Sequence, residues 1–151
     1  MRLVLTLKGE IVEYLKDLVD YGTIAVLGIM SILAIGFAIE RVFFYSNVNI
    51  EVFDTKNKIE AALTKNLSAI SLIGSNAPYV GLLGTVCGVM VVFYEIGQKG
   101  GLQPSEVVVG LSLALKATAL GLLVAIPSTM IYGACLRKVD LLIGKWEDAR
   151  S

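Results

Sequence analysis

The chain has 151 residues, of which 56% are hydrophobic and only 17% are charged, and its mean hydropathy is +0.75. These proportions exclude an ordinary soluble domain and indicate a small integral membrane protein. Basic and acidic side chains number 13 each, so the charge balance gives no reason to expect a nucleic-acid partner.

Residues 10–20 form an amphipathic segment ahead of the first long apolar run. At helical spacing, Ile11, Leu15 and Leu18 share one face, and the acidic side chains lie elsewhere. Such a helix either lies flat in the membrane interface or caps the helix bundle while facing water. The sequence leaves both alternatives open.

Residues 21–45 form the first predicted membrane span. The first 19 of them are uncharged, which at helical rise is enough to cross roughly 28 Å of hydrocarbon. Glu40 and Arg41 end this run and are followed by aromatic residues, a combination typical of the headgroup boundary. Residues 46–70 then mix charged and apolar residues at helical spacing, which predicts a cytoplasmic helix or loop that continues into the second span.

The second span is predicted over residues 74–97, in a stretch without charged residues except near its far end. A turn-rich connection over residues 98–105 leads to the third span, residues 106–136, and to an amphipathic tail, residues 137–151. The predicted fold is therefore an all-α membrane protein. It has three transmembrane helices, cytoplasmic helical extensions and an N-terminal amphipathic helix.

Two prolines are candidate kinks or hinges within the spans. Pro78 lies in the first turns of the second span, where a missing N–H group does least harm. It either produces a simple kink or takes part in gating. Pro127 is the corresponding candidate in the third span.

Basic residues are distributed unequally between the two sides of the predicted membrane. The first loop, with Arg41 at its start, and the tail together carry eight Lys and Arg residues, whereas the N-terminal segment and the 98–105 connection carry four. Because basic residues accumulate on the cytoplasmic side, the N-terminus is predicted to lie outside and the C-terminus in the cytoplasm.

The second and third spans each carry a stripe of small residues. Gly81, Gly84 and Gly88 recur at spacings of three and four on one helical face. Gly110 and Gly121 belong to a similar stripe in the third span. In lipid, small residues let helices approach closely, so these five glycines are the predicted helix-packing positions.

Thr85 and Thr118 are predicted to lie at one depth near the middle of the bilayer. Thr85 precedes Gly97 by 12 residues, and Thr118 follows Glu106 by 12. Each hydroxyl therefore lies roughly 18 Å below the connection between the two helices. The alternative is that each hydroxyl bonds to the carbonyl four residues earlier in its own helix.

Lys116 is the only formal charge in the middle of a predicted span. An ammonium at that depth costs about 2.5–3.5 kcal/mol on insertion scales, so we expect it to face water or an opposite charge. The alternative is snorkelling, although the nearer membrane edge is roughly 15 Å away at helical rise. No Asp, Glu or His lies in mid-span, so a partner must supply a carboxylate if this site handles protons.

Residue combinations that carry enzyme chemistry are not evident in the sequence. There is no histidine, no phosphate-binding loop and no Ser/His/Asp or Cys/His arrangement. Cys87 and Cys135 lie in apolar runs without metal-ligand spacing. We therefore expect no enzyme activity, no metal site and no cofactor.

Two motifs resemble the ExbB/TolQ/MotA family, the motor-channel subunits of bacterial inner membranes that the proton-motive force drives. They are APYVGLLGTV at residues 77–86 and ALKATALGL at residues 114–122, and Glu40-Arg41 also fits. The resemblance implies a pentamer around a pore lined by the second and third helices, with the two threonines facing the pore. It also implies a dimer of ExbD-like single-span proteins that supply a membrane aspartate, and coupling of proton flow to a TonB-like protein.

The sequence departs from the family pattern in two ways. The family usually carries a glutamate at the position of Leu113 and an apolar residue at that of Lys116, so we predict that Lys116 faces the pore and takes over part of that glutamate's role. The short cytoplasmic loop argues against a flagellar stator of the MotA type. The alternatives to an ExbB role are a TolQ-like role in envelope integrity, and a passive scaffold or small transporter.

Overall fold

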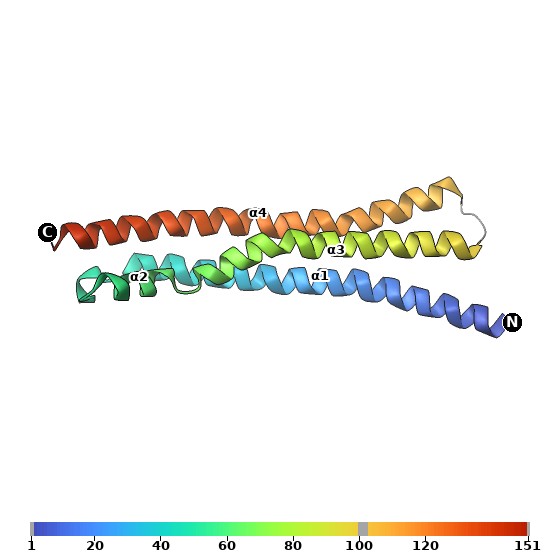
Figure 1. The fold of residues 1–151 in the computed structure, drawn as a ribbon, viewed down its shortest axis with the longest axis horizontal. Coiled ribbons are helices and arrows are strands. Elements are labelled where there is room, and N and C mark those ends of the chain that lie inside the picture. The colour runs from blue at the N-terminus through green and yellow to red at the C-terminus, as the bar shows by residue number, and fades with distance from the viewer. Residues whose placement is uncertain (1, 100–102, 151) are drawn as a thin grey trace. The chain divides into compact units, whose positions relative to one another are not determined.

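The computed structural model describes residues 2–99 and 103–150, and within these ranges every regular element is a helix (Figure 1). The elements are α1 (Arg2–Asn47), a 3₁₀ turn η1 (Ile50–Val52), α2 (Lys56–Thr64), α3 (Leu67–Lys99) and α4 (Pro104–Asp148).

Among the residues that the structure describes, three helical stretches are long and apolar enough to cross a membrane: Tyr14–Asn47, Leu67–Gln98 and Pro104–Asp148. The prediction of an all-α membrane protein with three transmembrane helices is therefore confirmed. The amphipathic segment over residues 10–20 and the first span form one continuous helix, α1, because no proline or turn signal separates them. Where the bilayer begins along α1 stays a prediction.

The connection between α1 and α3 differs from the expected single helix. The sequence predicts a helix that continues into the second span, whereas α2 ends at Thr64 and α3 begins at Leu67. The break lies at Asn66, whose φ of 64° is left-handed. Asparagine tolerates this conformation better than most residues, and the Asn66 amide donates a hydrogen bond of 2.6 Å to Glu40 at the end of the first span.

Contacts divide the chain into two compact units. Unit 1 comprises Met1–Ile29 and Ala77–Val124, and unit 2 comprises Met30–Asn76 and Ala125–Ser151. The long helices α1, α3 and α4 each contribute residues to both units. Unit 1 holds Thr85 and Thr118, and unit 2 holds α2.

Unit 2 has an apolar core built around α2. Ile59 and Leu63, one turn apart on α2, are fully buried. They pack in one cluster with residues from the end of α1, the start of α3 and the end of α4. The buried members of this cluster are Tyr45, Ile59, Leu63, Leu67, Cys135, Val139 and Trp146.

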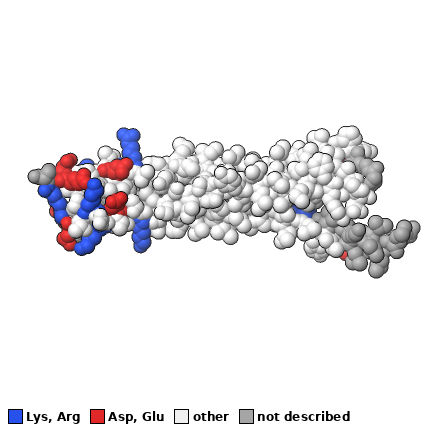
Figure 2. Space-filling view, in the orientation of Figure 1, with Lys and Arg blue, Asp and Glu red and all other residues white. Residues whose placement is uncertain are grey.

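Polar contacts fasten the end of α4 to the segment before α2. The indole of Trp146 and the guanidinium of Arg150 both donate to the Phe53 carbonyl, at 2.9 and 2.6 Å. Lys56 lies 2.6 Å from Glu147, and this hydrogen bond raises the pKa of the Lys56 ammonium. Side chains of both charges gather over this end of unit 2 (Figure 2), as expected for a part of the chain that faces water.

Arg41 is a buried cation that joins α1 to the last turn of α2. Its side chain is 2% exposed, and its guanidinium donates to the Ala62 carbonyl at 3.1 Å and to Glu40 at 2.6 Å. The Tyr45 hydroxyl donates to the Leu63 carbonyl at 2.8 Å. Two carbonyls that the end of α2 would leave without helical partners are thus satisfied from α1.

Arg41→Met is expected to lower the free energy of unfolding by about 1–3 kcal/mol, because the partly buried Ala62 carbonyl loses its donor. Methionine keeps most of the apolar stem, so loss of packing contributes little. Denaturation of the purified protein in detergent, followed by circular dichroism, measures the change. The matched control is Lys58→Met, which removes an exposed cation whose one ion pair among the described side chains is with Asp54. Equal stability of the two variants would contradict the expectation.

Candidate functional site

In unit 1, α3 and α4 approach so closely at Gly81 and Gly121 that their backbones touch. A Cβ atom at Gly81 would lie 2.6 Å from the Ala117 carbonyl oxygen, and one at Gly121 would lie 2.7 Å from that of Ala77. The neighbouring atoms are backbone on both sides, so neither helix accommodates even a methyl group without moving away.

The other three predicted packing glycines also lie at close contacts within unit 1. Cβ atoms at Gly88 and Gly110 would meet the side chains of Ala114 and Val92, at 2.9 and 2.7 Å. At Gly84, a Cβ atom would lie 2.8 Å from Thr23 of α1. All three long helices therefore contribute to this part of the molecule.

Thr85 and Thr118 meet across the close contact between α3 and α4. Their hydroxyl oxygens lie 2.5 Å apart, and Thr85 Oγ1 also lies 3.0 Å from the Ala114 carbonyl. Each hydroxyl has one proton, so the consistent arrangement is that Thr118 donates to Thr85 and Thr85 donates to Ala114. The own-helix alternative, Thr85 to Gly81 at 3.3 Å, is the longer bond. Both threonines are half-buried.

Lys116 does not join this pair. It lies two residues before Thr118, about 200° around α4, and its side chain is exposed. Among the described side chains, no acid lies within salt-bridge distance of Lys116. Leu113 precedes it by one helical turn and is also exposed, so these two residues share a face of α4.

Pro78 and Pro127 lie inside α3 and α4, and both helices continue through them. The division between the two units crosses α3 between Asn76 and Ala77 and crosses α4 after Val124. Each crossing lies within three residues of a proline. The proline positions thus coincide with a change of packing partners, and their role as hinges stays a prediction.

Charged residues near the ends of the spans form a feature that the sequence analysis did not single out. Lys16, Glu95 and Glu106 line one pocket of unit 1. The sequence pointed to these three residues only through their positions, since each lies in a terminal turn of a different span. Across the described residues, no group of three or more His, Cys, Asp or Glu side chains is placed to hold a metal ion.

Comparison with known proteins gives one consistent family. The MotA/TolQ/ExbB proton channel family matches residues 38–148. The chain is 55% identical over 138 residues to the biopolymer transport protein ExbB of Helicobacter pylori, covering 91% of this chain and 95% of that protein. It is 50% identical over 135 residues to ExbB of Aquifex aeolicus, covering 89% and 91%. With the Tol-Pal system protein TolQ of Pseudomonas aeruginosa it shares 37% over 87 residues, or 58% of this chain and 38% of TolQ.

The fold and the site define a multi-pass helical membrane protein with a close α3–α4 contact that carries two bonded hydroxyls. The chain belongs to the MotA/TolQ/ExbB proton channel family. The family resemblance inferred from the two sequence motifs is confirmed.

Proposed function

We propose that this protein is an ExbB-type subunit that couples the proton-motive force of the bacterial inner membrane to TonB-dependent transport across the outer membrane. The chain is 55% and 50% identical to two ExbB proteins, in each case over about nine-tenths of its length, and this similarity supports the assignment. The structural observation that carries it is the Thr85–Thr118 hydrogen bond, because it places two bonded hydroxyls at the contact between two membrane-spanning helices.

The proton carrier comes from a partner in this proposal. The middle parts of the three spans lack Asp, Glu and His, and threonine does not titrate in the physiological range. An ExbD-like single-span protein would supply the membrane aspartate, as a dimer inside a pentamer of this chain. The N-terminus would lie in the periplasm and the C-terminus in the cytoplasm.

Lys116 is proposed to attract a partner's carboxylate at the exposed face of α4, which is the side of the helix opposite the Thr85–Thr118 pair. Its ammonium has no acidic neighbour among the described side chains, and an unpaired charge in a span requires water or a counter-charge. It shares its face with Leu113, where the family usually has a glutamate. An acid drawn to this face would be oriented by a cation rather than by a second carboxyl group.

The energy available is sufficient for a mechanical step. Moving one charge through the membrane field releases about 2.3 kcal/mol per 100 mV, so several protons together supply enough to bias a rotation or a piston movement. No covalent chemistry is involved, and the proposed role is therefore not enzymatic.

Thr118→Val and Thr85→Val test the proposal. Each is expected to lower proton flux about tenfold, since valine keeps the shape but cannot form the hydroxyl hydrogen bond. The measurement uses liposomes that contain this protein and an ExbD-like partner, with a pH-sensitive dye inside. Thr129→Val is the matched control, because within the described part of the chain Thr129 bonds only to carbonyls of its own helix. Unchanged flux in both variants, with the complex intact by mass, would overturn the proposed role of the pair.

A TolQ-type role is the second candidate, because the chain also matches part of a TolQ protein. A deletion strain distinguishes the two roles. Loss of growth under iron or cobalamin limitation supports the ExbB role, whereas detergent sensitivity with normal growth supports the TolQ role. A passive scaffold or transporter would be indicated if the protein forms a stable complex without any acidic single-span partner.

A further inference from the structure

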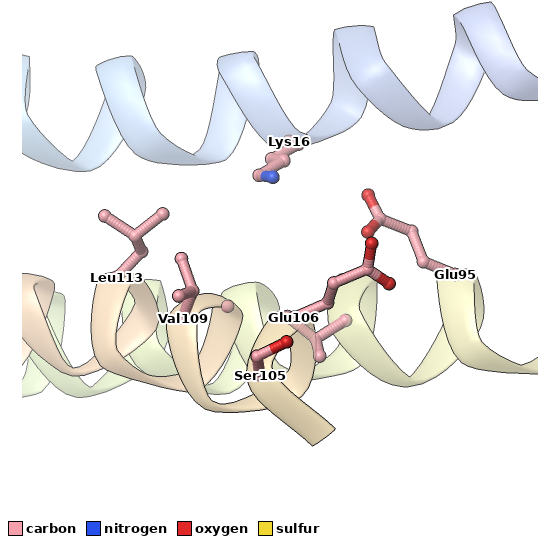
Figure 3. Close-up of a pocket in the computed structure, with 8 residues that line it drawn as sticks. Lys16, Glu95, Ser105, Glu106, Val109 and Leu113 are labelled. Carbon is pink, nitrogen blue, oxygen red and sulfur yellow. The ribbon is translucent and has the colours of Figure 1, made fainter. Parts of the chain in front are cut away.

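One pocket of unit 1 brings together charges from all three long helices (Figure 3). It has a volume of about 370 Å³ and lies between α1 and the ends of α3 and α4 that approach the connection. Lys16 extends from α1 toward the other two helices, and the carboxylates of Glu95 and Glu106 face one another. Among the described side chains, none of these three groups forms a salt bridge.

The lining of this pocket changes from polar to apolar along the membrane-spanning helices. Lys16, Glu95 and Glu106 lie within the first or last four residues of the three apolar stretches, and Ser105 lies beside Glu106. Val109 and Leu113 line the pocket one and two turns further into the span. Headgroups and acyl chains of a phospholipid follow the same order from the bilayer surface inward.

The charges of the lining match a zwitterion. A phosphate requires a cation such as Lys16 and a donor such as the Ser105 hydroxyl. A primary ammonium requires acceptors, and two facing carboxylates provide several. The volume of the pocket is near the lower end of the range for small-molecule sites. It therefore suits a lipid headgroup and the first part of the acyl chains, but not a whole lipid.

We propose that this pocket binds the headgroup of a phospholipid with a primary ammonium, of the phosphatidylethanolamine class. Lys16 binds the phosphate, Glu95 and Glu106 bind the ammonium, and Val109 and Leu113 contact the upper acyl chain. Phosphatidylcholine fits less well because its trimethylammonium group cannot donate hydrogen bonds to the carboxylates. Phosphatidylglycerol has no ammonium and brings a net negative charge toward them. The inference does not depend on proton coupling.

Lipid retention tests the proposal. The full-length protein is reconstituted in vesicles of equal parts dioleoyl-phosphatidylethanolamine, -phosphatidylcholine and -phosphatidylglycerol, extracted gently, and weighed by native mass spectrometry. We expect about tenfold more phosphatidylethanolamine than phosphatidylcholine on the protein, given the strength of hydrogen bonds to charged groups. The double variant Glu95→Gln/Glu106→Gln is expected to lose this preference. Lys16→Met is expected to lower retention of both lipids and to keep the ratio.

The matched control is Asp17→Asn/Asp20→Asn, which removes two acidic charges from α1 near the pocket without altering its lining. It should retain lipids as the unsubstituted protein does. Equal retention of all three lipids by the unsubstituted protein would overturn the proposal, and so would a preference that survives in the double variant. Proton flux is measured separately, so failure here leaves the proposed function unaffected.

Discussion

Gly121→Ala is expected to lower the free energy of unfolding by about 1–3 kcal/mol, the range measured when side chains are forced into well-packed interiors. The added methyl group would lie 2.7 Å from the Ala77 carbonyl oxygen and 3.1 Å from the Gly81 Cα atom. Because both neighbours are backbone, no side-chain rotation relieves the contact, and α3 must move away from α4. Denaturation in detergent, followed by circular dichroism, gives the change in stability.

Gly133→Ala is the matched control on the same helix. A Cβ atom at Gly133 has no heavy atom within 4 Å, so nothing opposes the better helix propensity of alanine. This variant is expected to be neutral or more stable by up to about 1 kcal/mol. If Gly121→Ala behaved like Gly133→Ala, the close backbone contact between α3 and α4 would be contradicted.

Separation of α3 from α4 also has a functional consequence. The Thr85–Thr118 hydrogen bond crosses the same contact, one turn from Gly81 and Gly121. Gly121→Ala alone is therefore expected to lower proton flux, as Thr118→Val does. Gly133→Ala is expected to keep normal flux. If Gly121→Ala loses stability but conducts protons normally, the close packing of α3 and α4 is not needed for proton flux, and the proposed link between this packing and the role of the hydroxyls is contradicted.

Lys116→Met is expected to abolish TonB-dependent uptake while assembly stays intact. The proposed counter-charge for the partner's carboxylate is then absent, and methionine fills a similar volume. Uptake of an iron chelate or cobalamin by a deletion strain carrying the variant measures the effect. Removal of a mid-span charge makes insertion easier by about 2.5–3.5 kcal/mol, so a loss of uptake cannot be attributed to failed insertion.

Lys138→Met provides the comparison for this substitution. Lys138 is an exposed cation of α4 near its cytoplasmic end in the proposed orientation, outside the middle of the span. Normal uptake is expected with this variant. Unimpaired uptake with Lys116→Met would rule out the proposed pairing, even if the threonine variants lose flux.

Much of the fold could be predicted because long apolar runs have few structural solutions in lipid. The backbone of each run must satisfy its own hydrogen bonds, so uncharged stretches of about 20 residues become helices. The helix break at Asn66 could not be predicted, because the apolar spacing on either side of this residue favours one continuous helix. Two residues, Lys65 and the left-handed Asn66, separate α2 from α3, and Asn66 is held by Glu40 from α1.

The sequence predicts how deep in the membrane the candidate site lies, but not which side chains meet there. Counting residues from the connection places Thr85 and Thr118 at one level, and the structure brings them together. The same count gives Lys116 a similar depth, yet its side chain leaves the opposite side of α4. The positions of Lys16, Glu95 and Glu106 in terminal turns of the spans place them at one level, but the sequence does not show that these side chains line the same pocket.

The amino-acid sequence by itself determined three membrane spans, two stripes of small residues, one mid-span cation and the family to which the chain belongs. The tertiary structure alone decided that Thr85 bonds across to α4 more closely than to its own helix, and that α1 contributes Thr23 and Lys16 to unit 1. The physical reason is that helical periodicity fixes which residues share a face. Which faces meet is settled by close packing between helices, and that depends on the shapes of all the side chains at once.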